Sequence, residues 1–186
     1  IKVASAKAEN KDKTKANNDL VTVSSRNFLA EETGRYAGSR GDPSKMVANY
    51  AGVSSGNDAR NDIIVRGNSP LGVLWRMEGI DIPNPNHFSA QGATGGPISM
   101  LNNNILGNSD FLTGAFPAEY GNKTAAVFDI KLRNGNNEQN EYTGSLGING
   151  IEIGAEGPIS KKNGSSYLIN YRYSTLEVFN KLGIRF

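Results

Sequence analysis

The sequence predicts an α+β fold in which short strands, short helices and long loops come first and longer antiparallel strands follow. Glycine is abundant, with 22 of 186 residues, and asparagine is frequent; both permit the positive-φ turns that separate short strands. Apolar residues make up 37% of the chain and the mean hydropathy is −0.46, which is low for a globular domain. The C-terminal part alternates apolar and polar residues, which is typical of strands with one apolar face.

Composition also excludes several classes of protein. With 20 basic and 18 acidic residues the net charge is +2, so no basic surface for nucleic acid is indicated. The chain has no cysteine, which excludes disulfide frameworks, thiolate zinc sites and cysteine nucleophiles. No apolar stretch approaches about 18 residues, so no membrane-spanning helix is expected. The first residues do not form a signal peptide, and we expect a fragment of a longer chain.

The N-terminal region is predicted to contain two short strands and a helix. Residues 1–6 form the first strand, and a polar linker completes an N-terminal segment over residues 1–19. The apolar run at residues 20–23 predicts the second strand. A serine at position 24 or 25 is a suitable helix N-cap, which predicts a helix to about Tyr36.

A stronger helix signal is the pair Asp42-Pro43. The Asp side chain can accept a hydrogen bond from an unpaired backbone N–H, and Pro needs no N–H at the first helical position. The helix then carries Met46 and Val47 on one side. It is expected to end at Gly52, because glycine suits the left-handed backbone of a C-terminal cap.

Two apolar runs flank the polar turn at residues 66–70 and predict strands at 63–65 and 72–75. The second run ends in an acidic turn at Glu78. The next segment, residues 83–97, is a long loop rich in Pro, Gly and Asn. Loops of that length in a compact domain are usually functional or disordered.

The remaining chain is predicted to be mostly strand. A short helix is expected at residues 99–104, and strands are expected at 110–113 and 126–132. Beyond a polar spacer, three segments alternate apolar and polar residues, as in a barrel wall with an apolar outside or in the sheet of a soluble domain. These segments span residues 142–148, 151–155 and 167–173.

Four motifs in this order resemble the plug domain of TonB-dependent outer-membrane receptors, especially the Bacteroidetes type. The likeness covers about residues 20–133. The motifs are the helix that starts at Asp42 and ends in NYAGV, the letters IIVRG at 63–67, the run from Val73 to Pro83 with Glu78 where the family has Asp, and AEYGN at 118–122 followed by VFDI at 127–130. One departure is Thr113-Gly114, where many relatives carry Arg-Gly.

The resemblance implies a plug domain with a small mixed β-sheet, short helices and long loops over residues 20–135. It implies that residues 136–186 are the first antiparallel β-strands of a truncated transmembrane barrel. Such a protein lies in the outer membrane of a Gram-negative bacterium and imports a scarce nutrient, without enzyme activity or a cofactor. Its partners are a TonB-type energy-coupling protein, bound through a segment not in this chain, its own β-barrel, and an unidentified small-molecule, glycan or peptide substrate.

The resemblance also assigns roles to residues. Two apical loops are expected to contact substrate, through Asn68, Ser69 and Leu71 in the first and Asn84, Asn86, His87, Phe88 and Gln91 in the second. Four further side chains are expected to stabilise the plug, namely Arg66, Glu78, Glu119 and Tyr120. His87 is the only histidine, so no metal site is expected.

Enzymatic readings are weak on the residues alone. Glu78 and Asp81 are close in sequence, but a glycosidase pair must face each other across a cleft. His87 has no nucleophile motif beside it. The alternative to a receptor plug is therefore not an enzyme but a soluble, exported interaction or glycan-binding domain.

Overall fold

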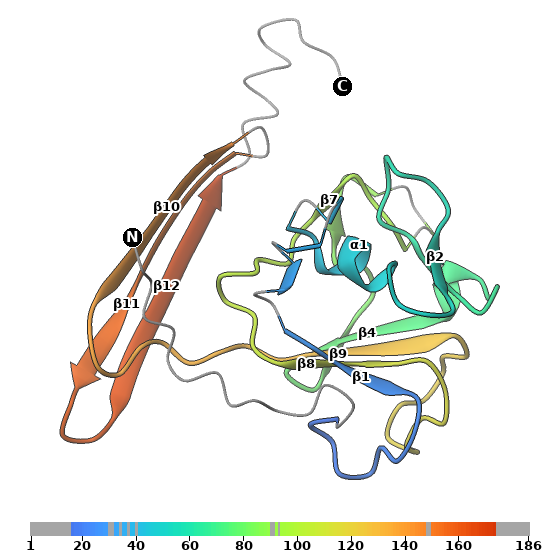
Figure 1. Cartoon of the computed structure of the whole chain (residues 1–186), viewed down its shortest axis with the longest axis horizontal. Helices are drawn as coiled ribbons and strands as arrows, with labels where there is room; N and C mark the ends of the chain where they lie inside the picture. The colour runs from blue at the N-terminus through green and yellow to red at the C-terminus, as the bar shows by residue number, and fades with distance from the viewer. Residues whose placement is uncertain are drawn as a thin grey trace, which may run out of the picture. The chain divides into compact units, whose positions relative to one another are not determined.

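The computed structural model describes residues 16–29, 32–33, 35–36, 38–39, 41–89, 92, 94–147 and 150–173. The described chain divides into two compact units, one that ends at Arg133 and one that begins at Asn134 (Figure 1). Within these ranges no helix is both long and apolar enough to cross a membrane. The strand expected at residues 1–6 lies outside the described residues.

The first unit is built on a five-stranded mixed sheet (Figure 1). Its two central strands, β9 and β4, run parallel, and every other neighbouring pair is antiparallel. In spatial order the strands are β1 (Ser25–Phe28), β8 (Ser109–Leu112), β9 (Ala126–Ile130), β4 (Val73–Met77) and β5 (Ile80–Ile82).

Two small hairpin-like sheets and little helix complete this unit. Strand β2 (Val53–Ser55) pairs with β3 (Ile63–Val65), and β6 (Asn86–His87) pairs with β7 (Ile98–Ser99). The only α-helix among the described residues is the five-residue α1 (Pro43–Val47), and η2 (Pro70–Gly72) is a single 3₁₀ turn. The mixed sheet and long loops agree with the expected fold class, while the helix content is lower than expected.

The predicted start of α1 is confirmed. Asp42 is the N-cap, and its Oδ1 accepts a hydrogen bond of 2.8 Å from the backbone N–H of Ser44. Pro43 is the first helical residue. Met46 and Val47 are both fully buried, so the apolar side of the helix is packed into the core. The predicted end at Gly52 is wrong, because the helix ends at Val47 with Ala48 as its C-cap. Gly52 lies beyond the helix and has a positive φ of 79°.

The helix predicted after Ser24 or Ser25 is wrong, and so is the strand predicted at residues 20–23. Residues from Ser25 to Phe28 form β1, because their backbone pairs with β8 and Phe28 is fully buried. These tertiary contacts outweigh a local helical preference. Leu20 is largely exposed, so the apolar run that suggested the earlier strand has no core to bury it.

The helix predicted at residues 99–104 is also wrong. Ser99 belongs to β7, and its Oγ accepts a hydrogen bond of 3.1 Å from the N–H of Leu101. Asn102 Oδ1 accepts one of 2.9 Å from the N–H of Asn104. Such local bonds from Ser and Asn side chains give the backbone an alternative to helix.

One face of the five-stranded sheet packs on the main hydrophobic core. Phe128 of β9 is the hub, with its ring centroid 5.5 Å from Phe28, 5.4 Å from Phe111 and 5.0 Å from Trp75. The Phe28 and Phe111 rings meet it edge-on, a favourable arrangement for aromatic pairs. All five residues of β9 are buried, so the predicted alternation along this strand does not separate a wet face from a dry one.

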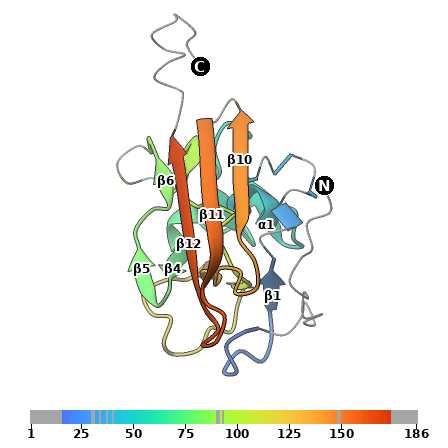
Figure 2. The same cartoon turned by 90° about the vertical axis from the view of Figure 1, so that its left-hand side faces the viewer.

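The second unit is a three-stranded antiparallel sheet of β10 (Glu141–Gly147), β11 (Gly150–Ser160) and β12 (Ser165–Tyr173), seen side by side in Figure 2. The three predicted alternating segments are confirmed as strands. Residues in register share a face of a sheet, and the pairing gathers the large apolar side chains on one face. They are Tyr142, Leu146, Ile151, Ile153, Ile169, Tyr171 and Tyr173, all exposed.

The opposite face of this sheet is mostly polar, although Leu168 also lies on it, in register with Glu156. Glu152 is in register with Ser145 and Arg172, and Thr143 lies one row away. Asn170 Nδ2 donates a hydrogen bond of 2.9 Å to Glu152 Oε1, across neighbouring strands. The sheet is therefore strongly two-sided, with the apolar side left uncovered within this unit.

The first prediction concerns the aromatic hub. Replacing Phe128 with Ala should lower the free energy of unfolding of the first unit by about 3–5 kcal/mol, because it removes a buried ring and leaves a cavity among three others. Urea unfolding of the whole chain, followed by the fluorescence of Trp75, its single tryptophan, measures this change. Phe88→Ala is the matched control, since that ring is exposed, and it should change stability by less than about 0.5 kcal/mol. Equal effects of the two substitutions would contradict the hub.

Candidate functional site

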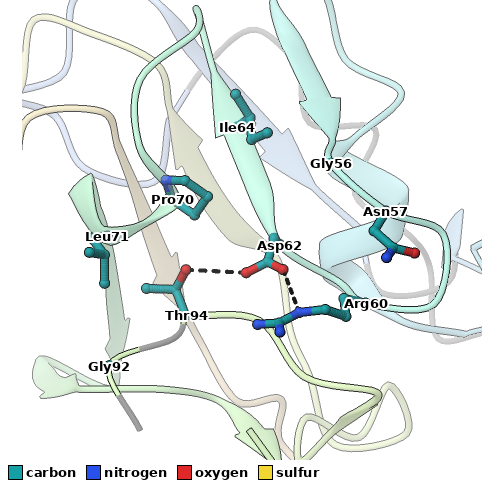
Figure 3. A pocket seen from close by; sticks show the side chains of 9 residues that line it. All are labelled: Gly56, Asn57, Arg60, Asp62, Ile64, Pro70, Leu71, Gly92 and Thr94. Atoms are coloured by element: carbon teal, nitrogen blue, oxygen red, sulfur yellow. Dashed lines mark hydrogen bonds and ion pairs between the residues drawn. The ribbon is translucent and has the colours of Figure 1, made fainter. Parts of the chain in front are cut away.

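The first unit has a cleft of about 430 Å³ that we call the three-loop cleft (Figure 3). Three polar segments that lie apart in the sequence meet there: the loop after β2, the turn before β4 and the loop after β6. Such a cleft suits part of a small ligand. Its lining residues are Gly56, Asn57, Arg60, Asp62, Ile64, Pro70, Leu71, Gly92 and Thr94.

Asp62 organises the polar side of the cleft. Arg60 Nε donates a hydrogen bond of 2.8 Å to Asp62 Oδ2, and Thr94 Oγ1 lies 3.5 Å from Asp62 Oδ1, both drawn in Figure 3. Arg60 Nη2 also donates to the carbonyl of Gly95 at 3.1 Å. A Cβ on Gly95 would lie 2.3 Å from Asp62 Cγ, so glycine is required for this close approach.

The other side of the cleft is apolar. Ile64, Pro70 and Leu71 line it, and Leu71 is exposed. The Leu71 backbone is fixed by η2, which begins where Ser69 Oγ accepts a hydrogen bond of 3.3 Å from the Leu71 N–H. Because the one guanidinium is already paired with the one carboxylate, the cleft offers hydrogen bonds and an apolar wall rather than net charge.

The two predicted loops do meet at this cleft, but only Leu71 of the predicted substrate-contacting residues lines it. Ser69 caps η2, and Asn68 Nδ2 donates 3.1 Å to the Val65 carbonyl. These two side chains therefore hold the shape of the first loop. Gln91 lies outside the described residues.

Asn84 and Asn86 hold the shape of the second loop. Asn84 Nδ2 donates to Ser89 Oγ at 2.9 Å, and Asn86 Nδ2 donates to the Thr94 carbonyl at 3.0 Å. Asn86 Oδ1 in turn accepts a hydrogen bond from Asn61 Nδ2. These hydrogen bonds place Thr94 at the cleft. They occupy the side-chain amides of Asn84 and Asn86.

Phe88 stands apart as an exposed aromatic residue in the same loop. Its side chain is 74% exposed, and its φ is +57°, in the left-handed region that a bulky residue rarely adopts. His87 lies beside it, with ring centroids 6.2 Å apart. Neither ring lines the three-loop cleft. A strained, exposed residue of this kind is a candidate for ligand contact.

Sequence reasoning missed Asn57, Arg60, Asp62 and Thr94. The signal that could have been used is the polar run Arg60-Asn61-Asp62 immediately before a short buried strand, since charged side chains at a strand end often face a common cleft. Thr94 could not have been found, because only the folded loop brings it to Asp62.

Arg66 and Glu78 occupy tight turns. Glu78 and Gly79 have φ of 50° and 83°, as in a two-residue hairpin turn between β4 and β5, and Glu78 Oε1 accepts a hydrogen bond of 2.6 Å from the Leu132 N–H. Arg66 has φ of 50°, and a Cβ on Gly114 would lie 3.3 Å from its Nη1. No ion pair joins Arg66 to another side chain within the described ranges.

On the sheet face opposite the aromatic hub, polar side chains form a line across all five strands, which we call the polar row. Strand register places its members side by side: Asn27, Asp110, Asp129, Arg76 and Asp81. Arg76 Nη1 lies 3.4 Å from Glu119 Oε2, and its guanidinium lies over the Tyr120 ring at 5.2 Å. Tyr120 donates a hydrogen bond of 3.0 Å to Asp129 Oδ2. Glu119 and Tyr120 thus tie the loop before β9 to the row, and we include both side chains in the polar row.

Burial shifts two titrating groups of this row. Loss of solvent raises the pKa of Asp110 above its usual range, although N–H donors from Asn17 and Asn18 partly offset the effect. Burial also raises the pKa of Tyr120 to about 12, with Asp129 contributing in the same direction. Across the described residues, no group of three or more His, Asp or Glu side chains could hold a metal ion.

Comparison with known proteins gives a likeness of fold. No protein-family model and no curated protein matches the sequence. A solved structure of a variant ferric enterobactin receptor from Pseudomonas aeruginosa, in complex with enterobactin, matches with a TM-score of 0.51 and 17% identity over 76% of this chain. A second variant of that receptor, also with enterobactin, gives 0.49 and 18% over 74%.

This chain covers only 23% of the receptor's length in both comparisons. At this level of identity the match concerns the fold. The fold of the chain is accordingly like that of part of this ferric enterobactin receptor.

A prediction follows for Tyr120 at alkaline pH. An unfolded Tyr loses its proton near 10.0, whereas Tyr120 in the fold loses it near 12, so stability should fall as pH rises through this window. Tyr120→Phe removes this contribution. The loss of unfolding free energy between the two pH values should therefore be smaller by about 2 kcal/mol, which is what the pKa difference corresponds to. Urea unfolding followed by circular dichroism at pH 9 and pH 12 measures it.

The control is Tyr142→Phe, because Tyr142 is exposed in the other unit. Its pH dependence should match that of the unsubstituted chain. Tyr50, whose pKa burial also raises, is present in all three proteins and contributes equally. An unchanged alkaline fall in Tyr120→Phe would show that Tyr120 is not buried against Asp129.

Proposed function

We propose that the chain is the plug and the first barrel strands of a TonB-dependent outer-membrane receptor of the Bacteroidetes type, which imports a scarce nutrient. In this proposal residues 20–135 form the plug, residues 136–186 begin the barrel, and residues 1–19 are the N-terminal strand and linker. The observation that carries the proposal is the receptor-like fold over 76% of the chain. The protein is a transporter component and not an enzyme.

The two-sided sheet of β10, β11 and β12 supports the assignment of a barrel wall. Barrel strands alternate apolar residues toward lipid with polar residues toward the lumen. Tyr171 and Ile153 are in register on the apolar face, while Asn170 bonds Glu152 on the polar face. An uncovered apolar face of this kind is unfavourable in water, and a lipid environment removes that cost.

The three-loop cleft supports a role in substrate contact. It joins the two loops that the resemblance places at the apical end, and it combines a hydrogen-bonding side at Asp62 with an apolar wall at Leu71. The proposed contacts extend to the exposed ring of Phe88 and its neighbour His87, with Asn68, Ser69, Asn84 and Asn86 holding the shape of the loops. Gln91, outside the described residues, stays a predicted contact. The substrate is a small molecule, glycan or peptide.

Arg66 is proposed to bind the inside of the barrel. Its backbone is left-handed, and its exposed side chain places the guanidinium beside Gly114. A guanidinium pairs well with a carboxylate through several donors.

The proposed gating has two steps. Substrate binding at the loops alters the plug, and a TonB-type protein then pulls on the upstream segment to open a path.

The barrel assignment predicts opposite environments for neighbouring residues of β12. Spin labels attached at Tyr171→Cys and Asn170→Cys, in the natural full-length protein in outer membranes, report collisions with oxygen and with a water-soluble nickel complex. This chain contains no cysteine, and any cysteine elsewhere in the full-length protein is replaced before labelling. The label at 171 should favour oxygen several-fold more than the label at 170, because oxygen concentrates in lipid.

Ile169→Cys and Arg172→Cys are the matched repeats on the two faces. The same alternation should appear in this second pair. Equal accessibility at all four positions, or a preference for the nickel complex at 169 and 171, would refute the barrel wall. That result would favour the soluble, exported interaction or glycan-binding domain.

A further inference from the structure

The segment just before β1 is fastened to the polar row by one carboxylate. Asp110 accepts hydrogen bonds from the backbone N–H of Asn17, at 2.9 Å to Oδ1 and 2.8 Å to Oδ2, and from the N–H of Asn18 at 3.3 Å. The side chain of Asn17 adds a bond of 3.2 Å. Asn27, on β1 itself, reaches the same carboxylate at 3.4 Å.

This carboxylate has lost nearly all contact with water, since Asp110 is only 2% exposed. A buried carboxylate is costly unless it is paired or fully hydrogen-bonded. Its neighbour in register, Asp129, carries the same charge. The N–H groups of Asn17 and Asn18 therefore replace the hydrogen bonds from water that the Asp110 carboxylate loses on burial. The same bonds hold the segment in place.

Asn18 fastens the segment at a second point of the row. Its Nδ2 donates to Tyr120 Oη at 3.2 Å and to Glu119 Oε1. Asn17 Nδ2 donates 2.9 Å to the carbonyl of Asn108. All of these contacts are polar, and all involve two adjacent asparagines.

Apolar contacts hold the segment weakly. Between positions 16 and 24 only Ala16 is buried, and Leu20 and Val23 are exposed. Val21 is partly buried against the small cluster of Leu74, Leu112 and Val127. A segment with few buried apolar contacts opens at a lower free energy than the sheet it covers.

Breaking the hydrogen bonds that hold the segment costs little net free energy. When Asn17 and Asn18 leave, water reaches Asp110 and replaces the lost donors. Exchange of protein donors for water changes the free energy far less than leaving a buried acceptor unpaired. Both states are therefore accessible, and the carboxylate is satisfied in each of them.

We propose that residues 16–20 form a releasable latch, closed on the buried carboxylate of Asp110 and opening before the five-stranded sheet. Its role rests on the proposed function: a pull on the chain upstream of residue 16 meets the latch first. The next element along the chain is β1, an edge strand that pairs only with β8. Because β8 carries Asp110, opening the latch exposes the strand to which β1 is bound.

Amide hydrogen exchange of the natural full-length protein tests the latch directly. The amides of Asn17 and Asn18 should exchange at least about 100-fold faster than that of Phe128, because local opening precedes loss of the sheet. Asp110→Asn should speed exchange at residues 17 and 18 by about tenfold or more, because it removes the charged acceptor of their hydrogen bonds. The exchange rate at Phe128 should not change.

Asp81→Asn is the matched control, because Asp81 belongs to the same polar row but touches Arg76 rather than the segment. It should leave exchange at residues 17 and 18 unchanged. If Asp110→Asn fails to fold, Asn18→Ala serves instead. It removes the side-chain bonds to Tyr120 and Glu119 and the local bond from the Leu20 N–H, and it should raise exchange several-fold.

Two results would overturn the latch. One is exchange at residues 17 and 18 as slow as at Phe128, which would make the segment an inseparable part of the sheet. The other is equal acceleration by Asp110→Asn and Asp81→Asn. Hydrogen exchange needs neither a barrel nor a coupling protein, so the latch and the receptor assignment can fail separately: spin labels on β12 test the receptor, and exchange at residues 17 and 18 tests the latch.

Discussion

The burial of β9 on both faces is the constraint on which the first unit depends. All five of its residues are buried. The side chains on each face therefore need neighbours of matching polarity. Phe128 meets Phe28, Phe111 and Trp75 on one side. On the other side Asp129 needs Tyr120 and Lys131. The aromatic hub and the polar row are thus two consequences of one strand.

The strands on either side of β9 lead into the loops and segments that carry the proposed sites. Strand β4 lies parallel to it and begins directly after the turn that places Leu71 at the three-loop cleft. The same strand carries Arg76 in the polar row. Strand β8 carries Asp110, which holds Asn17. One sheet therefore connects, through the paired strands β4, β9 and β8, the cleft proposed for substrate and the latch proposed at the N-terminal side.

Strong local signals made part of this fold predictable. Asp42-Pro43 fixes a helix start whatever surrounds it, and the period-2 alternation from Tyr142 to Tyr173 specifies strands without reference to other parts of the chain. Short elements were predictable only where an apolar run was unambiguous, as at Ile63 to Val65. The mixed sheet was expected through the family resemblance, because strand order is not encoded in any local pattern.

The errors have two physical origins: contacts between distant residues, and local hydrogen bonds from side chains to the backbone. Ser25 to Phe28 is a strand because β8, more than 80 residues later, pairs with it. The side chains of Ser99 and Asn102 bond nearby backbone and prevent the expected helix. Asp62 and Thr94 form a cleft, and Asp110 and Asn17 form a latch, only after folding. Asn84 was located correctly as loop, whereas Asn86 belongs to the short strand β6. The side-chain amides of both residues bond to neighbouring groups of the protein.

The receptor assignment is tested most directly by the heat-dependent gel mobility of the natural full-length protein in separated outer membranes. A closed barrel resists detergent until it is heated, because its strands have no free edge. The account predicts an outer-membrane band that migrates differently before and after boiling. A soluble product of about this length, or a membrane band that boiling does not shift, would contradict it.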